Sequence, residues 1–402
     1  MSSTIVSPLF AELVTQINSG RISVAHLRAL LDDPSKILPR GEWIEEFCGM
    51  VPRQGRTGDF GLLCDQPYYT ARVESMSRLV WGKHASESHG KLQHVAVDED
   101  DGWIFYLTGQ KQIMRMHLDG TEQYFALNDD PVLTLKYMEG HLLYIAAAPD
   151  GSQQLVVIDL KSTDFQACWR SVWMDRIMDH IYANGSAYYV GQQNNRDYTY
   201  QNHTRLSNAM ERIVGIHPTQ HSIGYVGRPL NGGHYEIHWQ ENILSAAHPI
   251  SGVQFVNETP LYARSSLKNG GPQMVYLGDT PQGDMWHDVS YLQWAADKPL
   301  YAAKLKDLDN PSWRVVWGNH KYSTRPRVES LIFADGRPAY IGTATTDPTR
   351  VQVYLGEEEC SKEYDAIFSL RVTEDSLSFG ARRGRRLFRV KRMFIKDAVP
   401  TT

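Results

Sequence analysis

Hydrophobic and polar residues alternate along most of the chain from about residue 55 onward. Apolar side chains take every second position in short runs such as LQHVAVDED, GWIFYLTGQ, QIMRMHLDG, LLYIAAAPDG and QLVVIDL. Gly, Pro, Asn or Asp separates these runs, and a period of two is typical of half-buried β-strands. Because no ten-residue pattern of helical period interrupts them, we expect antiparallel β-structure rather than βαβ units.

One motif returns at a regular interval. It reads PLYARSSLKNGGPQMVYLG at 260–278, PLYAAKLKDLDNPSWRVVWG at 299–318 and PAYIGTATTDPTRVQVYLG at 338–356. Its aromatic residue recurs in steps of thirty-nine residues, at Tyr262, Tyr301, Tyr340 and Phe379. The same phase continues upstream with looser spacing, at Tyr69, Tyr106, Tyr144, Tyr189 and Tyr225. We interpret these aromatics as marks of equivalent strands in a repeated unit.

A repeat of about forty residues, long enough for four short strands, resembles β-propeller proteins in general. The resemblance implies a mainly β chain, folded as a single β-propeller of about eight four-stranded blades, with seven to nine as the range. The chain has no GH…WD pair, no kelch double glycine and no aspartate-box pattern. No family's functional residues are therefore carried over to this chain.

The first fifty residues have a different pattern. Apolar residues fall at helical spacing at Leu9, Phe10, Leu13, Val14 and Ile17, and a second such set follows Ser23. The sequence predicts a short α-helical N-terminal segment over 1–55, packed on the propeller or binding a partner. The propeller itself is predicted over 56–396, and 397–402 is predicted to be a flexible tail.

Composition limits the class of protein. The 402 residues are 42% hydrophobic and 22% charged, with a formal net charge of −5. No run of eighteen apolar residues occurs, so no membrane span is expected. The N-terminus lacks a basic stretch followed by an apolar one, so we expect no signal peptide. The four cysteines show no CxxC pairing, which favours reduced thiols in a cytoplasmic protein without a cofactor.

The most polar stretch of the repeat region is VGQQNNRDYTYQNHTRLSNAM, at 190–210. We interpret it as a long loop that binds a polar ligand, since Tyr and Asn combine contact area with adaptable hydrogen bonding. The candidate ligand-binding residues are Asn194, Arg196, Tyr198, Tyr200 and His203. A solvated loop without a ligand is the alternative.

Histidines gather between residues 203 and 248. HPTQH and HYEIH have the spacing H-x₃-H, which suggests a metal site. On a strand, however, residues four apart lie about 13 Å from each other and cannot share one ion. We therefore predict no metal site, even with Glu236 nearby, and assign His234 and His238 to ligand binding instead. Trp286, in the stretch DMWHDVSYLQW, is a further ligand-binding candidate.

His287 and Asp288 are the weak catalytic candidates in the chain. A neighbouring imidazole and carboxylate suggest acid–base chemistry, but no nucleophile motif accompanies them. They support an alternative function, in which a carbohydrate-active hydrolase or lyase has its site at the mouth of the propeller channel.

Seven of the eleven residues in RRGRRLFRVKR, at 382–392, are Arg or Lys. Gly384 is predicted to be the tip of a hairpin, and anion binding is assigned to Arg382, Arg383, Arg385 and Arg386. Arg matches phosphate oxygens well, so a second alternative function is binding a nucleic acid or another phosphate-bearing partner. A solubilising outer hairpin that discourages edge pairing is the simpler interpretation.

The absence of a recognisable catalytic motif favours a non-catalytic binding or protein-interaction propeller. Its polar, aromatic loop face is expected to contact another protein or a polar small ligand, and no membrane.

Overall fold

The computed structural model describes residues 41–53, 56–125, 130–161, 167–306, 312–357 and 359–394. These residues form thirty-six strands, β1 to β36, and no helix. The strands make nine consecutive four-stranded antiparallel units, which we call blades 1 to 9. Blades 4 and 5 share one bridge, between Asp197 and Met210, and so form one eight-stranded sheet. The molecule therefore has eight hydrogen-bonded sheets and nine blades, and both counts lie within the predicted range.

Each blade is a simple meander, and its strands are numbered here from the inside outward. The first strands are β2 (Arg56–Leu63), β6 (Leu92–Asp98), β10 (Val132–Met138), β14 (Arg176–Ala183), β18 (Met210–Pro218), β22 (Ile250–Val256), β26 (Asp288–Ala295), β30 (Val328–Ala334) and β34 (Ala366–Val372). The second strands are β3 (Gln66–Val73), β7 (Trp103–Thr108), β11 (His141–Ala147), β15 (Ser186–Gln193), β19 (Ile223–Pro229), β23 (Thr259–Ser265), β27 (Lys298–Lys304), β31 (Arg337–Thr343) and β35 (Ser376–Arg383).

The outer half of each blade is shorter and more varied. The third strands are β4 (Met76–Trp81), β8 (Ile113–His117), β12 (Gln153–Asp159), β16 (Arg196–Gln201), β20 (Tyr235–Trp239), β24 (Gln273–Leu277), β28 (Trp313–Trp317), β32 (Val351–Leu355) and β36 (Arg386–Met393). The fourth strands are β5 (His84–Ala85), β9 (Glu122–Tyr124), β13 (Ala167–Arg170), β17 (Thr204–Arg205), β21 (Asn242–Ala246), β25 (Thr280–Trp286), β29 (His320–Arg325), β33 (Glu359–Cys360) and, in blade 9, β1 (Trp43–Met50).

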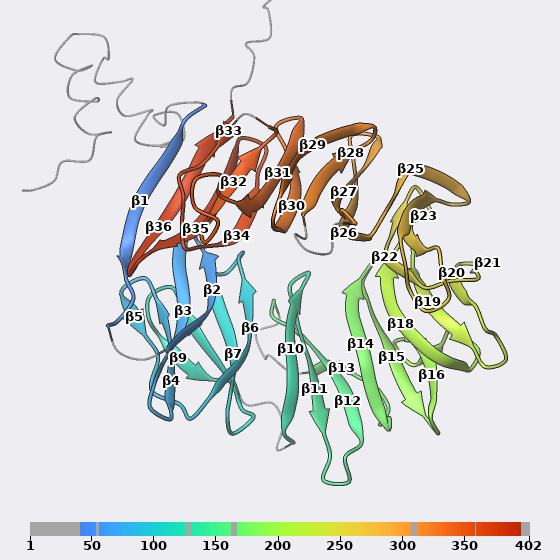
Figure 1. The fold of residues 1–402 in the computed structure, drawn as a ribbon. Helices are drawn as coiled ribbons and strands as arrows, with labels where there is room; N and C mark the ends of the chain where they lie inside the picture. The colour runs from blue at the N-terminus through green and yellow to red at the C-terminus, as the bar shows by residue number, and fades with distance from the viewer. Residues whose placement is uncertain are drawn as a thin grey trace, which may run out of the picture.

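The blades follow one another around a ring, and blade 9 lies beside blade 1 (Figure 1). Nine hydrophobic clusters fill the nine spaces between neighbouring blades, and the ninth joins Tyr69 and Ala71 of blade 1 to Leu387 of blade 9. The core therefore consists of the inter-blade spaces, as a propeller requires.

The recurring aromatics confirm the repeat. All nine, from Tyr69 to Phe379, lie on the second strand of successive blades, and all except the half-buried Tyr225 are buried. In three blades this tyrosine stacks on a tyrosine of the third strand directly opposite. The pairs are Tyr189–Tyr200, Tyr262–Tyr276 and Tyr340–Tyr354, with ring centroids 4.9, 5.5 and 5.2 Å apart.

Polar side chains also tie neighbouring blades together. At the start of three third strands, a side-chain oxygen accepts a hydrogen bond from a backbone N–H of the next blade's first strand. The pairs are Gln153 with Ile177 (2.8 Å), Asp197 with Ile213 (2.9 Å) and Gln273 with Val289 (2.9 Å). These bonds satisfy backbone donors that the first strand, with its irregular register, leaves free.

The prediction for the N-terminal segment is wrong over 43–50, where the chain forms β1 rather than a helix. β1 pairs with β36 in antiparallel register, from Trp43 opposite Arg392 to Met50 opposite Arg386. The predicted helices, at 9–17 and after Ser23, lie outside the described residues, as does the tail at 397–402. The alternation of apolar and polar residues in WIEEFC is short. Because the partner strand, β36, lies some 340 residues away, no local pattern identified β1 as a strand.

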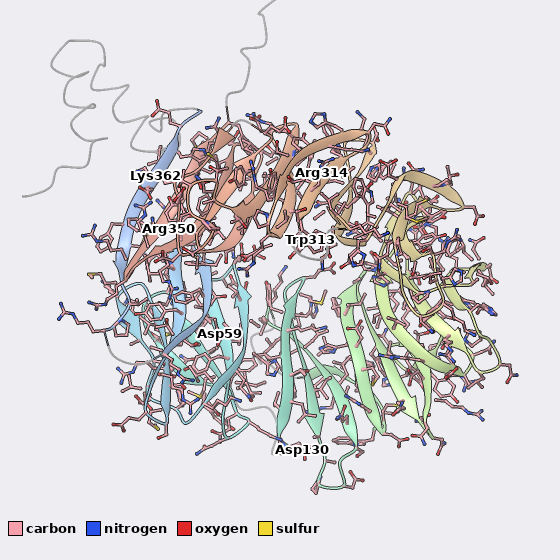
Figure 2. All side chains as sticks on the ribbon, in the orientation of Figure 1. Asp59, Asp130, Trp313, Arg314, Arg350 and Lys362 are labelled. Atoms are coloured by element: carbon pink, nitrogen blue, oxygen red, sulfur yellow. The ribbon has the colours of Figure 1, made fainter. Side chains whose placement is uncertain are left out.

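Charge complementarity holds β1 in place. Glu45 accepts hydrogen bonds from Tyr364 Oη (2.7 Å), Arg383 Nη2 (2.8 Å) and Lys362 Nζ (2.5 Å); Figure 2 labels Lys362 beside β1. Glu46 pairs with Arg389 (2.5 Å). Burial acts to raise the pKa of Glu45, but its bonds to Lys362 and Tyr364 and the charge of Arg383 outweigh it, so the pKa lies below its usual value.

Among the described residues, no helix is long and apolar enough to cross a membrane.

Replacing Glu45 by Gln tests the closure. We expect the free energy of unfolding at neutral pH to fall by about 1–3 kcal/mol, because a partly buried charged acceptor is lost while its donors remain. Glu46→Gln is the matched control, since Glu46 is 60% exposed and its pair should contribute less than about 1 kcal/mol. Urea unfolding of both variants measures the difference, and equal losses would contradict a special role for Glu45.

The same residue makes stability depend on pH. The pKa of Glu45 is lower in the folded chain, so its contribution is present above the unfolded-chain pKa and is lost as pH falls through the folded-state value. Acidification below the ordinary value of 4.5 should therefore destabilise the wild type more than Glu45→Gln. Parallel pH dependences for the two proteins would contradict this assignment.

Candidate binding site

The meander gives the ring two distinct faces. In every blade the turns between strands 1 and 2 and between strands 3 and 4 lie on one face. The turns between strands 2 and 3, and the links to the next blade, lie on the other. Binding residues in such a scaffold usually lie in these connections.

The first face is strongly acidic, and we call it the acidic face. Its described turns carry fourteen carboxylates: Asp65, Glu99, Asp100, Asp101, Asp119, Glu139, Glu241, Glu258, Asp279, Asp297, Asp335, Glu357, Glu374 and Asp375. Against these, the same described turns carry two basic residues, Lys83 and Lys161. Part of this excess is turn chemistry, since Asp65, Asp297 and Asp335 have positive φ. Glu139 and Glu258 also have positive φ, but glutamate, unlike aspartate, is not favoured in such turns, so turn geometry does not account for the whole charge.

The opposite face, which we call the basic face, is different. Its described turns and links carry Arg53, Lys91, Lys111, Lys268, Lys306, Arg327, Arg350, Lys362 and Arg385 against eight carboxylates. Several strands also end there in a cation, including Arg176, Arg196, Arg205, Lys304 and Arg386. The modest net charge of the chain therefore conceals a separation of charge between its two faces.

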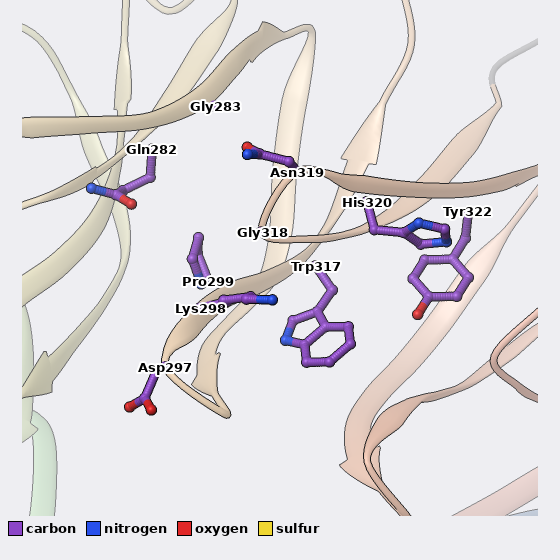
Figure 3. Close-up of a pocket in the computed structure, with 10 residues that line it drawn as sticks. All are labelled: Gln282, Gly283, Asp297, Lys298, Pro299, Trp317, Gly318, Asn319, His320 and Tyr322. Atoms are coloured by element: carbon purple, nitrogen blue, oxygen red, sulfur yellow. The ribbon is translucent and has the colours of Figure 1, made fainter.

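A pocket of about 560 Å³ opens on the acidic face at blade 7. Figure 3 shows Trp317 at its centre, with Lys298 beside the ring and Gln282, Asn319 and Asp297 around it. The indole Nε1–H donates to the Ala295 carbonyl (2.9 Å), which fixes the ring, and Lys298 Nζ lies 5.0 Å from its centroid. We call this the Trp317 pocket. An aromatic wall surrounded by amides and charges can hold a polar side chain or small ligand.

Two tight turns build the Trp317 pocket. Ala296 and Asp297 both have positive φ, and they bring Lys298 and the end of β28 to the same edge. Gly318 also has a positive φ, of +57°, and a Cβ there would lie 2.9 Å from the Lys298 side chain. Glycine is therefore required at this position both by the backbone and by the close approach.

The same construction occurs once more, in blade 1. Asp65-Gln66-Pro67 and Trp81-Gly82-Lys83-His84 correspond to Asp297-Lys298-Pro299 and Trp317-Gly318-Asn319-His320. Gly82 has a φ of +55°, and the Trp81 indole donates to Leu63 O (3.4 Å), the counterpart of Ala295 O. A pocket of about 780 Å³ lies over these turns, and we call it the closure pocket because β1 forms one wall.

The two pockets differ in their tryptophan. Trp81 is 1% exposed and lies beneath the closure pocket, whereas Trp317 is half-buried and lines its own pocket. The closure pocket presents Phe47, 56% exposed, and the bridge from Arg389 to Asp65 (2.8 Å) instead. Only the Trp317 pocket therefore offers an indole to a ligand.

The predicted polar loop at 190–210 is not a loop. The stretch forms β15, β16 and β17, joined by tight turns at Asn194–Asn195 and Asn202–His203. Alternating Tyr and Thr residues in RDYTYQ explain the strand, because both have high β-propensity. The interpretation as a loop was therefore wrong.

The structure does not bring the predicted ligand-binding residues together. Asn194 and Arg196 lie at the basic face, where the Asn194 N–H donates to Asp175 (2.8 Å), while His203 lies in a turn of the acidic face. Tyr200 is buried against Tyr189, and Tyr198 lies 5.3 Å beneath the Arg205 guanidinium. Trp286 is also buried, and its indole donates to Tyr301 Oη (3.2 Å).

His234 and His238 do converge, on one carboxylate. Their Nε2 atoms lie 2.9 and 2.7 Å from the two oxygens of Glu236, since residues at i, i+2 and i+4 share one face of β20. Burial acts to raise the pKa of Glu236, but the hydrogen bonds from both histidines lower it below its ordinary value. Among the described residues, no three His, Cys, Asp or Glu side chains are placed to hold a metal ion.

The catalytic candidates and the arginine run have other partners. His287 N–H donates to Lys304 O (3.0 Å), Asp288 accepts from the Val289 N–H (2.9 Å), and no hydrogen bond joins the two candidate side chains. In the arginine run, Gly384 forms the predicted hairpin tip, with a φ of +60°.

Two of the four anion-binding candidates contact the N-terminal strand region. Arg383 binds Glu45, and Arg385 donates twice to Val51 O (3.1 and 2.8 Å). Arg382 lies 5.4 Å from the Phe60 ring, and Arg386 is exposed. Anion binding at this hairpin stays a prediction.

The acidic face and the Trp317 pocket were not predicted. The repeat of WGKH at 81–84 as WGNH at 317–320 was a usable signal, since no other turn combines Trp, Gly and His in this order. The charge separation has no signal in the linear sequence until each turn has been assigned to a face.

No protein-family model matches the chain, and no curated protein matches it either. Solved structures do resemble it. BamB from Moraxella catarrhalis shares 9% identity, with a TM-score of 0.44, over 88% of this chain and 99% of that chain. The Dos1 propeller shares 10%, with a TM-score of 0.44, over 90% of this chain and 98% of that chain.

The β-propeller domain of the Trilobed protease from Pyrococcus furiosus, described as having an open velcro topology, shares 10% identity, with a TM-score of 0.40, over 79% of this chain and 99% of that chain. At such identities and TM-scores, the propeller assignment depends on the chain's own strand order and closed ring of cores.

The two tryptophans provide a matched pair for mutation. Trp81→Ala should lower the free energy of unfolding by about 3–5 kcal/mol, because it empties a fully buried site. Trp317→Ala should cost about half as much, since part of the ring already faces the pocket. Urea unfolding checks both values. A loss at Trp317 as large as that at Trp81 would mean that Trp317 is a core residue rather than a pocket wall.

Proposed function

We propose that this chain is a non-catalytic propeller that binds a protein partner, and that a basic segment of the partner lies across the acidic face. The observation that supports the proposal is the separation of charge, fourteen carboxylates against two cations in the described turns of one face. Such a face steers a basic partner toward it and raises the association rate, while like charges repel acidic partners.

The Trp317 pocket is the proposed anchor within this face. On the same face, Asp297 lines the pocket, and the turns of blades 5 and 6 contribute Glu241 and Asp279; all three are exposed. A partner side chain can stack on the indole and donate to Asp297, Gln282 or Asn319. Aromatic anchors in a pocket with a charged surround are typical of residues that dominate binding energy.

A triple variant tests the acidic face. Glu241→Gln, Asp279→Asn and Asp297→Asn remove three charges from the turns of blades 5, 6 and 7 on the acidic face without changing side-chain shape. We expect affinity for an oligolysine peptide to fall about tenfold at low salt, and the wild-type affinity to fall as salt rises. Fluorescence anisotropy with labelled peptide measures both effects.

The control removes three carboxylates from the basic face, through Glu74→Gln, Glu87→Gln and Asp130→Asn. This variant has the same net charge as the test variant, so affinity should stay within about twofold of wild type. Equal losses in both variants would show that net charge alone governs binding. Preference for an oligonucleotide over oligolysine would instead support the nucleic-acid alternative and contradict the proposal.

A further inference from the structure

A third pocket, separate from the Trp317 pocket and the closure pocket, opens on the basic face at the outer part of blade 6. Its volume is about 360 Å³, at the lower end of the range of about 300–1,000 Å³ for ligand pockets. The link between blades 5 and 6 supplies His248, β23 and its turn supply Arg264 and Ser266, and β24 and β25 supply Tyr276, Met274 and Met285. None of the residues that line it is acidic.

The Arg264 guanidinium is held in a fixed position, and no described residue neutralises its charge. Its guanidinium carbon lies 4.0 Å from the centroid of the Tyr276 ring, which in turn stacks on the buried Tyr262. Stacking fixes the plane of the guanidinium while leaving its N–H groups free to donate. No described residue forms a salt bridge or hydrogen bond with the Arg264 side chain, although many other arginines of the chain are paired.

The rest of the pocket is consistent with an anionic ligand. His248 Nδ1 is buried and has no hydrogen-bond partner among the described residues. A buried nitrogen without a partner is costly, so a ligand oxygen or N–H that reaches it would be favoured. Lys268 lies in the turn between β23 and β24 that also supplies Ser266, and it adds a positive charge to this part of the basic face.

The strands next to Arg264 supply apolar side chains. Met274 pairs with Arg264 on one side and with Met285 on the other, and Met285 is 51% exposed. Thioethers adapt to flat or irregular apolar groups and make favourable contacts with aromatic rings. The pocket therefore combines one fixed cation with a soft apolar wall.

We propose that this pocket binds an oxyanion, a phosphate or carboxylate, carried on an aromatic or apolar group. Arg264 holds the oxyanion through two parallel N–H···O bonds, His248 contacts it from the side, and the apolar group lies against Met274 and Met285. The site lies on the face opposite the Trp317 pocket and is independent of the proposed partner binding.

Calorimetric titration of the full chain with phenyl phosphate tests the proposal. We expect one binding site, with affinity at least tenfold above that for inorganic phosphate, which lacks the ring, and above that for benzyl alcohol, which lacks the charge. Benzoate separates the two sources of the oxyanion, since tighter binding of benzoate than of phenyl phosphate identifies a carboxylate ligand. Either preference supports the site, and equal binding of benzyl alcohol and the anions overturns it.

Arg264→Met keeps an unbranched side chain over Tyr276 but removes the charge, and should weaken binding of the preferred anion at least tenfold. Arg176→Met is the matched control, because it removes an exposed charge of the basic face from blade 4. We expect less than a twofold change in this control. Equal weakening in the two variants would show diffuse attraction to the face rather than a site.

Met285→Glu is an independent test of the same site, for the case that Arg264→Met does not fold. Since Met285 is half-exposed, the change should leave the thermal unfolding midpoint unchanged while placing a carboxylate beside Arg264. We expect anion binding to disappear in this variant. A folded Met285→Glu protein that binds the anion with wild-type affinity contradicts the proposal.

Discussion

A β-sheet with two apolar faces must pack against another sheet on each face, and this requirement leads to the closed ring of blades. Each blade presents buried side chains toward the preceding blade and the following one, as with Leu143 and Tyr144 on adjacent positions of β11. An open row of blades would leave two such faces in water. Closing the row into a ring removes both, and blade 9 against blade 1 forms the last cluster.

The closure of the ring by β1 also explains why the chain carries an arginine run near its C-terminal end. Two acidic residues on β1 and an arginine run in β35 and β36 would each be unremarkable on a solvated hairpin. In the folded chain Glu45 and Glu46 lie among Arg383, Arg389 and Lys362, so the run provides the charges that hold the N-terminal strand. The attraction adds to seven residue pairs between β1 and β36, whose register a bulge between Phe47 and Gly49 interrupts. The same arginines are then less available to an external phosphate than their number suggests.

The sequence predicted the repeat better than it predicted the ends or the site. The recurring aromatics could be recognised because each lies on a second strand, and all except the half-buried Tyr225 are buried between two blades. β1 was not predicted because it pairs with β36, near the other end of the described chain. No local sequence pattern encodes a partner so distant. Arg196 and His203 seemed to belong to one polar loop because they are close in sequence, yet a single strand places them on opposite faces.

Comparison of the two repeated pockets shows how one turn design can give different surfaces. Blades 1 and 7 share the turns, the glycine at positive φ and the indole bond to the end of the first strand. What differs is how far each indole is packed against the following blade. Trp81 is buried in the cluster that joins blade 1 to Leu92 and Ile104 of blade 2, whereas Trp317 is only partly buried in the cluster between blades 7 and 8. The packing of a blade on its following neighbour therefore decides which copy of the pocket keeps an exposed indole, while β1 supplies only a wall of the closure pocket.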